Sequence, residues 1–133
     1  MFNLIYRDGA RENAGRYETL EKASAETALE CGTAVKLEGG KASEAGASDA
    51  VYGIVAADSP VGENAVVVLK VEHDMVFSVP TTTVASLAKG AKFAIATGSD
   101  IGKLGAKSDN GAATIVDACG ATNVGDRVEV RFE

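Results

Sequence analysis

Two stretches of about forty residues repeat the same order of features, and this internal repeat most constrains the fold. The first, residues 32–71, runs from a Gly-led segment through a Gly-Lys turn to an Ile-Val pair at 54–55 and a closing apolar segment. The second, residues 90–132, has the same order, with its Ile-Val pair at 115–116. Two copies are too few for a repeat array. We therefore expect an internal duplication that forms two halves of one closed or nearly closed β domain.

Strand-forming segments recur at regular intervals, with glycine-rich turns between them. They are 33–37, 51–57, 65–71, 73–79, 92–96, 113–118 and 127–132, with 15–22 as a further first strand. This spacing is typical of all-β proteins. In the last segment, Val128, Val130 and Phe132 alternate with charged residues, as in a strand with one buried face. The sequence predicts an all-β, mainly β fold of the β-barrel or β-tulip type, with a turn at His73 and Asp74.

The segments between these strands are predicted less uniformly. Residues 81–90 predict one short helix that connects the two halves, because threonines can cap its start and Gly90 can end it. The Gly/Ser/Ala-rich stretches 38–50 and 97–112 are predicted to be long surface loops. Residues 24–31 suit either one helical turn or a turn into the barrel.

The N-terminal 22 residues differ in character from the rest. Phe2, Leu4 and Tyr6 alternate with Asn3, Ile5 and Arg7, and Gly9 and Gly15 argue against a continuous helix. We expect residues 1–22 to be an extended N-terminal arm and residues 23–133 to be a single β-rich domain. A partner often orders such an arm. The alternatives are a frayed terminus and a strand of the protein's own barrel.

Composition and charge narrow the classes of partner. The 133 residues suit one domain, but the hydrophobic fraction of 46% is rich in Ala and Val, with only 5% aromatic residues. A thin core favours self-association. The net charge is −6, and Lys and Arg form no basic stripe, so we expect no direct nucleic-acid partner. No apolar run approaches the ~20 residues of a membrane span, and the N-terminus lacks a signal-peptide core, so we expect no membrane partner and assembly in a cytoplasm.

Cysteine and histidine give little sign of a metal or cofactor site. We interpret Cys31 and Cys119 as reduced, small, buried residues; the alternatives are a disulfide, or a metal site completed by His73. The scattered positions do not have the spacing of a zinc site. We expect no metal and no cofactor.

The search for catalytic groups favours a protein that is not an enzyme, with no catalytic residues. His73 lies between Glu72 and Asp74 and would need a nucleophile from Ser78 or the threonines at 81–83, but no nucleophile-elbow motif is present. The turn residues Asp58, Glu63, Asp117 and Asp126 suit a cation site, but acidic residues also favour turns, and calcium-loop spacing is missing. The Gly-Gly-Lys turn at 39–41 lacks the context of a phosphate-binding loop.

A family pattern emerges when the repeated motifs are read together. The elements are Gly32 to Leu37, Gly40-Lys41, Gly53-Ile54-Val55, Gly62-Glu63, Val66 to Val68, Lys89-Gly90, Lys92-Phe93, Gly102-Lys103, Gly125-Asp126 and Val128 to Val130. Over residues 32–132 the chain resembles the small Ala/Gly/Val-rich capsid cement or decoration proteins of tailed bacteriophages. The N-terminal arm departs from that pattern.

The resemblance implies a structural virion protein on the capsid exterior. Such proteins bind the outer surface of the expanded head as homotrimers and stabilise contacts between major capsid subunits, so the expected partners are the major capsid protein and further copies of the chain. We expect the arm to make the capsid contact through Phe2, Leu4, Tyr6 and Arg7, by adding a strand to a sheet edge. The alternatives are another virion component, such as a head-fibre base or a tail-tube-like β protein, or a ligand-binding β module.

Overall fold

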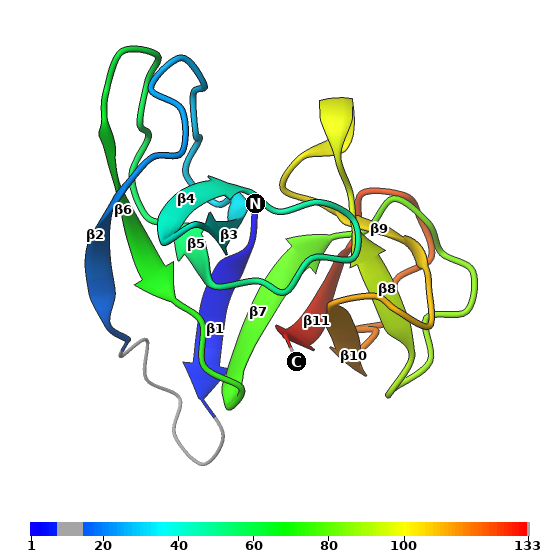
Figure 1. Ribbon diagram of the computed structural model, residues 1–133. Helices are drawn as coiled ribbons and strands as arrows, with labels where there is room; N and C mark the ends of the chain where they lie inside the picture. The colour runs from blue at the N-terminus through cyan, green and yellow to red at the C-terminus, as the bar shows by residue number, and fades with distance from the viewer. Residues whose placement is uncertain (8–14, 133) are drawn as a thin grey trace.

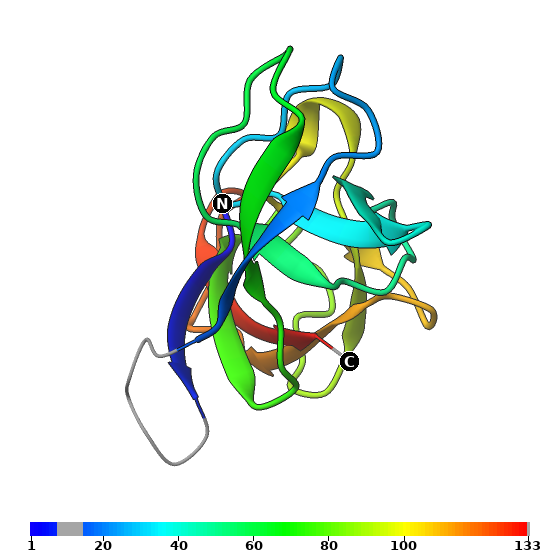
Figure 2. The ribbon, with the colours of Figure 1, turned by 60° about the vertical axis from the view of Figure 1, so that its left-hand side comes forward.

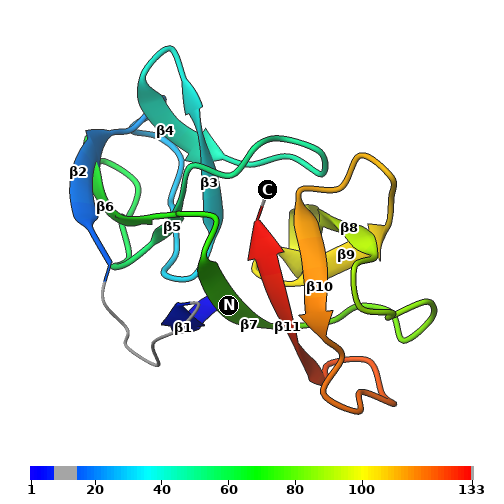
Figure 3. The same ribbon diagram turned by 90° about the horizontal axis from the view of Figure 1, so that it is seen from below.

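The computed structural model describes residues 1–7 and 15–132, which form two antiparallel β-sheets (Figure 1). The all-β prediction is confirmed, and each predicted strand segment contains or overlaps an observed strand. Within the described residues, the only helical element is a single 3-10 turn, η1 (Gly98–Asp100). Figure 3 shows the two sheets lying side by side, with β1 and β7 near the boundary between them.

The five-stranded sheet uses only residues from the first half of the chain. Its spatial order is β2-β6-β5-β3-β4, and all its pairings are antiparallel. The strands are β2 (Tyr17–Glu21), β3 (Ala34–Glu38), β4 (Lys41–Glu44), β5 (Gly53–Val55) and β6 (Ala65–Lys70). Alternation along β6 buries Val66 and Val68 and exposes Val67, as expected of a sheet with one face toward a core.

The six-stranded sheet combines the second half of the chain with the N-terminus. Its order is β1-β7-β11-β10-β8-β9. The strands are β1 (Asn3–Arg7), β7 (Met75–Pro80), β8 (Lys92–Ile95), β9 (Leu104–Lys107), β10 (Ala113–Asp117) and β11 (Arg127–Phe132). The predicted alternation in β11 is confirmed, because Val128, Val130 and Phe132 are all buried. The predicted turn at His73 and Asp74 also occurs, directly before β7.

The prediction of an extended N-terminal arm with few neighbours is wrong for residues 2–7. This segment contributes strand β1, which pairs antiparallel with β7 at the edge of the six-stranded sheet (Figure 2). The Phe2 side chain is only 2% exposed, and its N–H donates to the Gly32 carbonyl over 3.1 Å. The Met1 ammonium donates to the Gly102 carbonyl, and Arg127 Nη2 donates to the Met1 carbonyl over 3.0 Å. The alternative of a strand of the protein's own fold is the one observed.

The helix predicted for residues 81–90 does not form, and turns and bends take its place. The threonines bond to nearby backbone instead: Thr81 Oγ1 donates to the Thr83 carbonyl over 2.6 Å, and Thr82 Oγ1 donates to the Leu104 carbonyl over 2.7 Å. Such bonds compete with helical ones. Ser86 has φ of +63°, which a right-handed helix excludes. In the two predicted surface loops, β4 and β9 each form a hairpin with the preceding strand.

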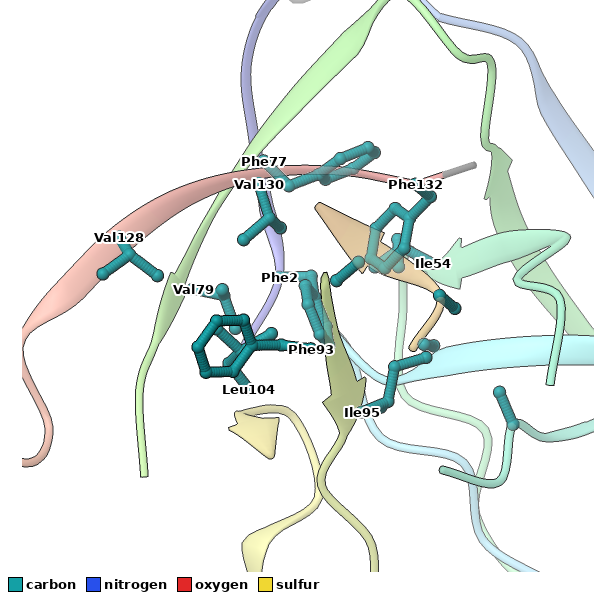
Figure 4. Packing of buried hydrophobic residues seen from close by; sticks show 14 of the residues in the cluster. Phe2, Ile54, Phe77, Val79, Phe93, Ile95, Leu104, Val128, Val130 and Phe132 are labelled. Carbon is teal, nitrogen blue, oxygen red and sulfur yellow. The ribbon is translucent and has the colours of Figure 1, made fainter. Parts of the chain in front are cut away.

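Buried side chains form two clusters that differ in composition. The smaller cluster lies in the five-stranded sheet and contains Leu29, Val35, Ala42, Val55, Val66 and Val68, in keeping with the thin core predicted from composition. The larger cluster contains all four phenylalanines, so the predicted thin core of Ala and Val is wrong for this cluster. Figure 4 shows Phe2, Phe77, Phe93 and Phe132 among the aliphatic residues. The Phe132 ring centroid lies 5.2 Å from that of Phe2 and 5.3 Å from that of Phe77.

Candidate functional site

The four residues predicted to contact a capsid do not form an exposed set. Phe2 is buried in the larger cluster, and Leu4 is half-buried against it. The side chains of Tyr6 and Arg7 lie outside the part of the chain that the structure describes. A side chain packed in a core is not available to a partner unless β1 leaves its sheet. We therefore withdraw Phe2 as a contact residue.

The groups considered for catalysis are separated along β7. His73 is exposed in the turn before this strand, and no hydrogen bond joins it to another described side chain. The Ser78 hydroxyl accepts from Arg127 Nε over 2.7 Å, near the other end of β7. The hydroxyls of Thr81 and Thr82 donate to backbone carbonyls beyond the end of the strand. The structure therefore does not bring these groups together as a base and a nucleophile.

The turn carboxylates mainly serve as acceptors for backbone N–H groups. Asp58 accepts from the Cys31 N–H and Asp117 from the Cys119 N–H, each over 2.7 Å. Asp126 accepts from the N–H groups of residues 122 and 123, each over 3.0 Å, and these bonds lower the pKa of its carboxyl. These contacts are what acidic side chains provide in turns.

One of these carboxylates belongs to a small cluster of potential metal ligands. Ligand atoms of Asp117, Cys119 and Glu129 lie within 4.8 Å of one another. Asp117 and Cys119 are exposed, and Glu129 is half-buried. Burial, followed by the charges of Glu129 and Asp117, raises the pKa of the Cys119 thiol, which disfavours the thiolate that binds metals. Because exposed acidic groups often gather without an ion, we assign no metal to this cluster.

Both cysteines are free thiols, but neither is buried as predicted. Cys31 is half-buried, and its Sγ donates to the Ala56 carbonyl over 3.4 Å. Cys119 is exposed in the turn after β10, with φ of +54°. Turn geometry, rather than packing, sets the position of Cys119.

A polar cluster that the sequence analysis did not identify lies on the five-stranded sheet. The Tyr52 hydroxyl donates to Glu18 Oε2 over 2.6 Å, and this bond is the largest cause that raises the pKa of Tyr52. Lys70 Nζ lies 5.8 Å from the Tyr52 ring centroid, within cation–π range. Glu18, Tyr52 and Lys70 are distant in sequence, and only the pairing of β2, β6 and β5 brings them together.

The surface clefts are shallow and varied in lining. A cleft of about 520 Å³ lies beside β4 and is lined by Ser24, Thr27, Glu38, Lys41 and Ser43 among other residues. A smaller cleft of about 260 Å³ runs between β1 and the five-stranded sheet, with Met1, Leu4, Tyr17 and Leu69 in its lining.

Comparison of the chain with protein-family models and with curated proteins finds no match. Among the described residues, no helix has the length and hydrophobicity needed to cross a membrane.

Proposed function

We propose that the two sheets are duplicated halves, residues 17–70 and 75–132, joined by a short turn. The spatial order of the first half is β2-β6-β5-β3-β4, and the order of the second, without β1, is β7-β11-β10-β8-β9. When the five strands of each half are numbered along the chain, both spatial orders read 1-5-4-2-3. The sequence repeat covered 32–71 and 90–132, so the proposed copies also include β2 and β7.

Backbone contacts support the same correspondence in atomic detail. The N–H of Gly32 donates to the Val55 carbonyl and the N–H of Gly90 to the Ile115 carbonyl, each over 2.8 Å. Both glycines have φ of +87°, a conformation that favours glycine. These contacts match Val55 with Ile115. The two Ile-Val pairs in the sequence would instead match Val55 with Val116, which is one residue further along.

A second set of contacts supports a nearly closed barrel in each half. A parallel bridge joins Lys22, directly after β2, to Ala42 of β4. A parallel bridge in the second half joins Thr81, directly after β7, to Leu104 of β9. Each bridge links the two outer strands of its five-strand set, which is the contact needed to close a barrel.

We further propose that the protein is a structural virion protein that decorates the exterior of an expanded phage head and stabilises contacts between major capsid subunits. The observation that carries this proposal is the match between the family-like motifs and the duplicated framework. Gly32 and Gly90 adopt the same backbone conformation before β3 and β8. Gly62 and Gly125, in the two Val-Gly-acidic turns, share φ of +96°. The motif residues of both copies thus have matching structural roles.

Two alternatives remain distinct from capsid decoration. Another virion component, such as a head-fibre base or a tail-tube-like protein, would use the same β framework. A ligand-binding β module would need a specific pocket, and the cleft beside β4 is the larger of the two described above. We favour decoration because the family-like motifs extend through both halves.

The test is to add the purified protein to expanded capsids that lack a decoration protein and to image the particles. Decoration predicts ordered density at symmetry-related positions on the outer surface, and higher resistance of the decorated heads to heat. Density confined to a vertex, or to a tail, would favour the other virion component. An absence of added density on the cognate capsid would contradict the proposal.

A further inference from the structure

The contact between the two halves uses a different surface of each half. On the five-stranded sheet, Ala34, Ile54 and Leu69 form a row across β3, β5 and β6, and they are only 2%, 4% and 8% exposed. We call this row the outer face of the first half, because the core of that half is formed by other residues, such as Val35 and Val55. The outer face belongs instead to the larger cluster, together with the phenylalanines of the second half.

The surface of the second half that receives this row is also defined by buried residues. Phe77, Ile95, Ala112 and Phe132 belong to the same cluster as the row, and Figure 4 shows Phe132 and Ile95 on either side of Ile54. We call these four residues the receiving surface. The Ile95 N–H also donates to the Ala47 carbonyl over 3.1 Å, a backbone bond between the halves. The contact within the chain uses the outer face of the first half and the receiving surface of the second half. It does not use the outer face of the second half or the receiving surface of the first half.

The unused outer face lies on the second half. With Val55 matched to Ile115, the strand pairings match Ala34 with Lys92, Ile54 with Thr114 and Leu69 with Arg131. Lys92 is exposed, and Thr114 and Arg131 are half-buried. An apolar row in one half therefore corresponds to a polar row with two basic residues in the other.

The unused receiving surface lies on the first half and contains the Tyr52 cluster. The same register matches Phe77 with Glu18, Phe132 with Lys70 and Ile95 with Leu37. Leu37 is 42% exposed, whereas Ile95 is 3% exposed. The first half therefore presents an exposed leucine, the carboxylate of Glu18 and the ammonium of Lys70, at the positions where the second half presents its buried contact.

We propose that the outer face of the second half docks on the receiving surface of the first half of another copy, in a head-to-tail contact. The contact would repeat the geometry of the one within the chain, with Lys92 on one of the two docking surfaces and Glu18 on the other. The net charges of the two halves have opposite signs. Residues 17–70 carry four basic and nine acidic side chains, a net charge of −5, and residues 75–132 carry six basic and five acidic side chains, a net charge of +1. Complementary potentials of this kind favour association and fix its register.

A head-to-tail contact produces either a closed ring or an open chain, depending on the angle between successive copies. This inference rests on the duplication proposed above and does not depend on capsid binding. Its occupant is a second copy of this chain, because the contact within the chain already supplies the geometry.

The experiment uses sedimentation velocity over micromolar to submillimolar concentrations with two charge-reversal variants. Lys92→Glu changes the outer face and Glu18→Lys changes the receiving surface. We expect the unaltered protein to self-associate, with weaker association in high salt, and each variant alone to associate at least about tenfold more weakly. An equimolar mixture of the two variants should associate again, because unlike charges then meet at the interface.

Matched controls separate this contact from general effects of charge or folding. Lys41→Glu and Glu26→Lys make the same charge changes elsewhere and should associate like the unaltered protein. Far-UV circular dichroism checks that every variant is folded. A monomer at all concentrations, or association that neither reversal weakens, would overturn the proposal. Normal capsid decoration by a monomeric protein would overturn it and leave the proposed function standing.

Discussion

The Tyr52 hydroxyl and the Glu18 carboxylate are joined by a hydrogen bond of 2.6 Å that connects the residue directly before β5 with β2, across the intervening strand β6. It ties an edge strand to the middle of the five-stranded sheet at a half-buried position. Because a carboxylate is the acceptor, the bond is of the stronger, charge-assisted kind.

Tyr52→Phe should lower the free energy of unfolding by about 1 kcal/mol, since it removes this bond and leaves the ring in place. The bond raises the pKa of Tyr52, so its contribution to stability should be present below pH 10.0 and lost as the pH rises through the higher folded-state value. Urea unfolding of both proteins at neutral and alkaline pH tests this. An equal difference in stability on both sides of the phenol titration would contradict it.

Phe2→Ala should destabilise the protein by about 3–5 kcal/mol, because it empties a fully buried aromatic site in the larger cluster. Asn3→Ala is the matched control, since Asn3 is the exposed residue directly after Phe2, and it should change stability by less than about 0.5 kcal/mol. Denaturant unfolding followed by circular dichroism measures both. Equal stability of Phe2→Ala and the unaltered protein would mean that β1 is not part of the fold in solution.

Stability should decline as the pH falls below 3.8, in part because the carboxyls of Asp49 and Asp126 have lowered pKa values in the folded state. The Gly46 N–H and then Lys36 lower the pKa of Asp49, and the N–H groups of Thr122 and Asn123 lower that of Asp126. A carboxyl whose pKa is lower in the folded state stabilises the fold at pH values above its unfolded-state pKa. This stabilisation is lost as the carboxyl binds a proton. Asp126→Asn should therefore reduce the slope of stability against pH in this range. An unchanged slope in thermal melts of this variant and of Asp49→Asn would count against these assignments.

Cys119 should react slowly with a maleimide or an alkylating agent in spite of its exposure. Its raised pKa lowers the fraction of reactive thiolate at neutral pH. Glu129→Gln and Asp117→Asn should each speed the reaction by removing a nearby negative charge. Peptide mass spectrometry, which separates Cys119 from Cys31, gives the rates. Faster alkylation of Cys119 than of a free cysteine in a model peptide would refute this prediction.

Alternation and turn chemistry in the sequence were enough to predict the all-β class and the main strands. In β11, Val128, Val130 and Phe132 recur at every second position, and this period alone requires a strand with one buried face. Such signals are local, because the pleat of a strand and the φ preferences of glycine depend on only a few neighbouring residues.

The sequence alone did not determine the roles of segments whose partners are distant. The burial of Phe2 depends on β7 and Phe132, which are more than seventy residues away in the sequence. The threonines after Pro80 suit a helix cap locally, but contacts with Leu104 of β9 favour turns.

The polar cluster of Glu18, Tyr52 and Lys70 likewise needed the pairing of three strands before it existed as a cluster. The sequence by itself predicted the main strands, because strand periodicity is local, but it missed β1, β4 and β9, which lie in segments interpreted as an arm and two surface loops. Only the tertiary structure decided which strands pair and which faces they bury, since long-range contacts determine the free energy of those choices.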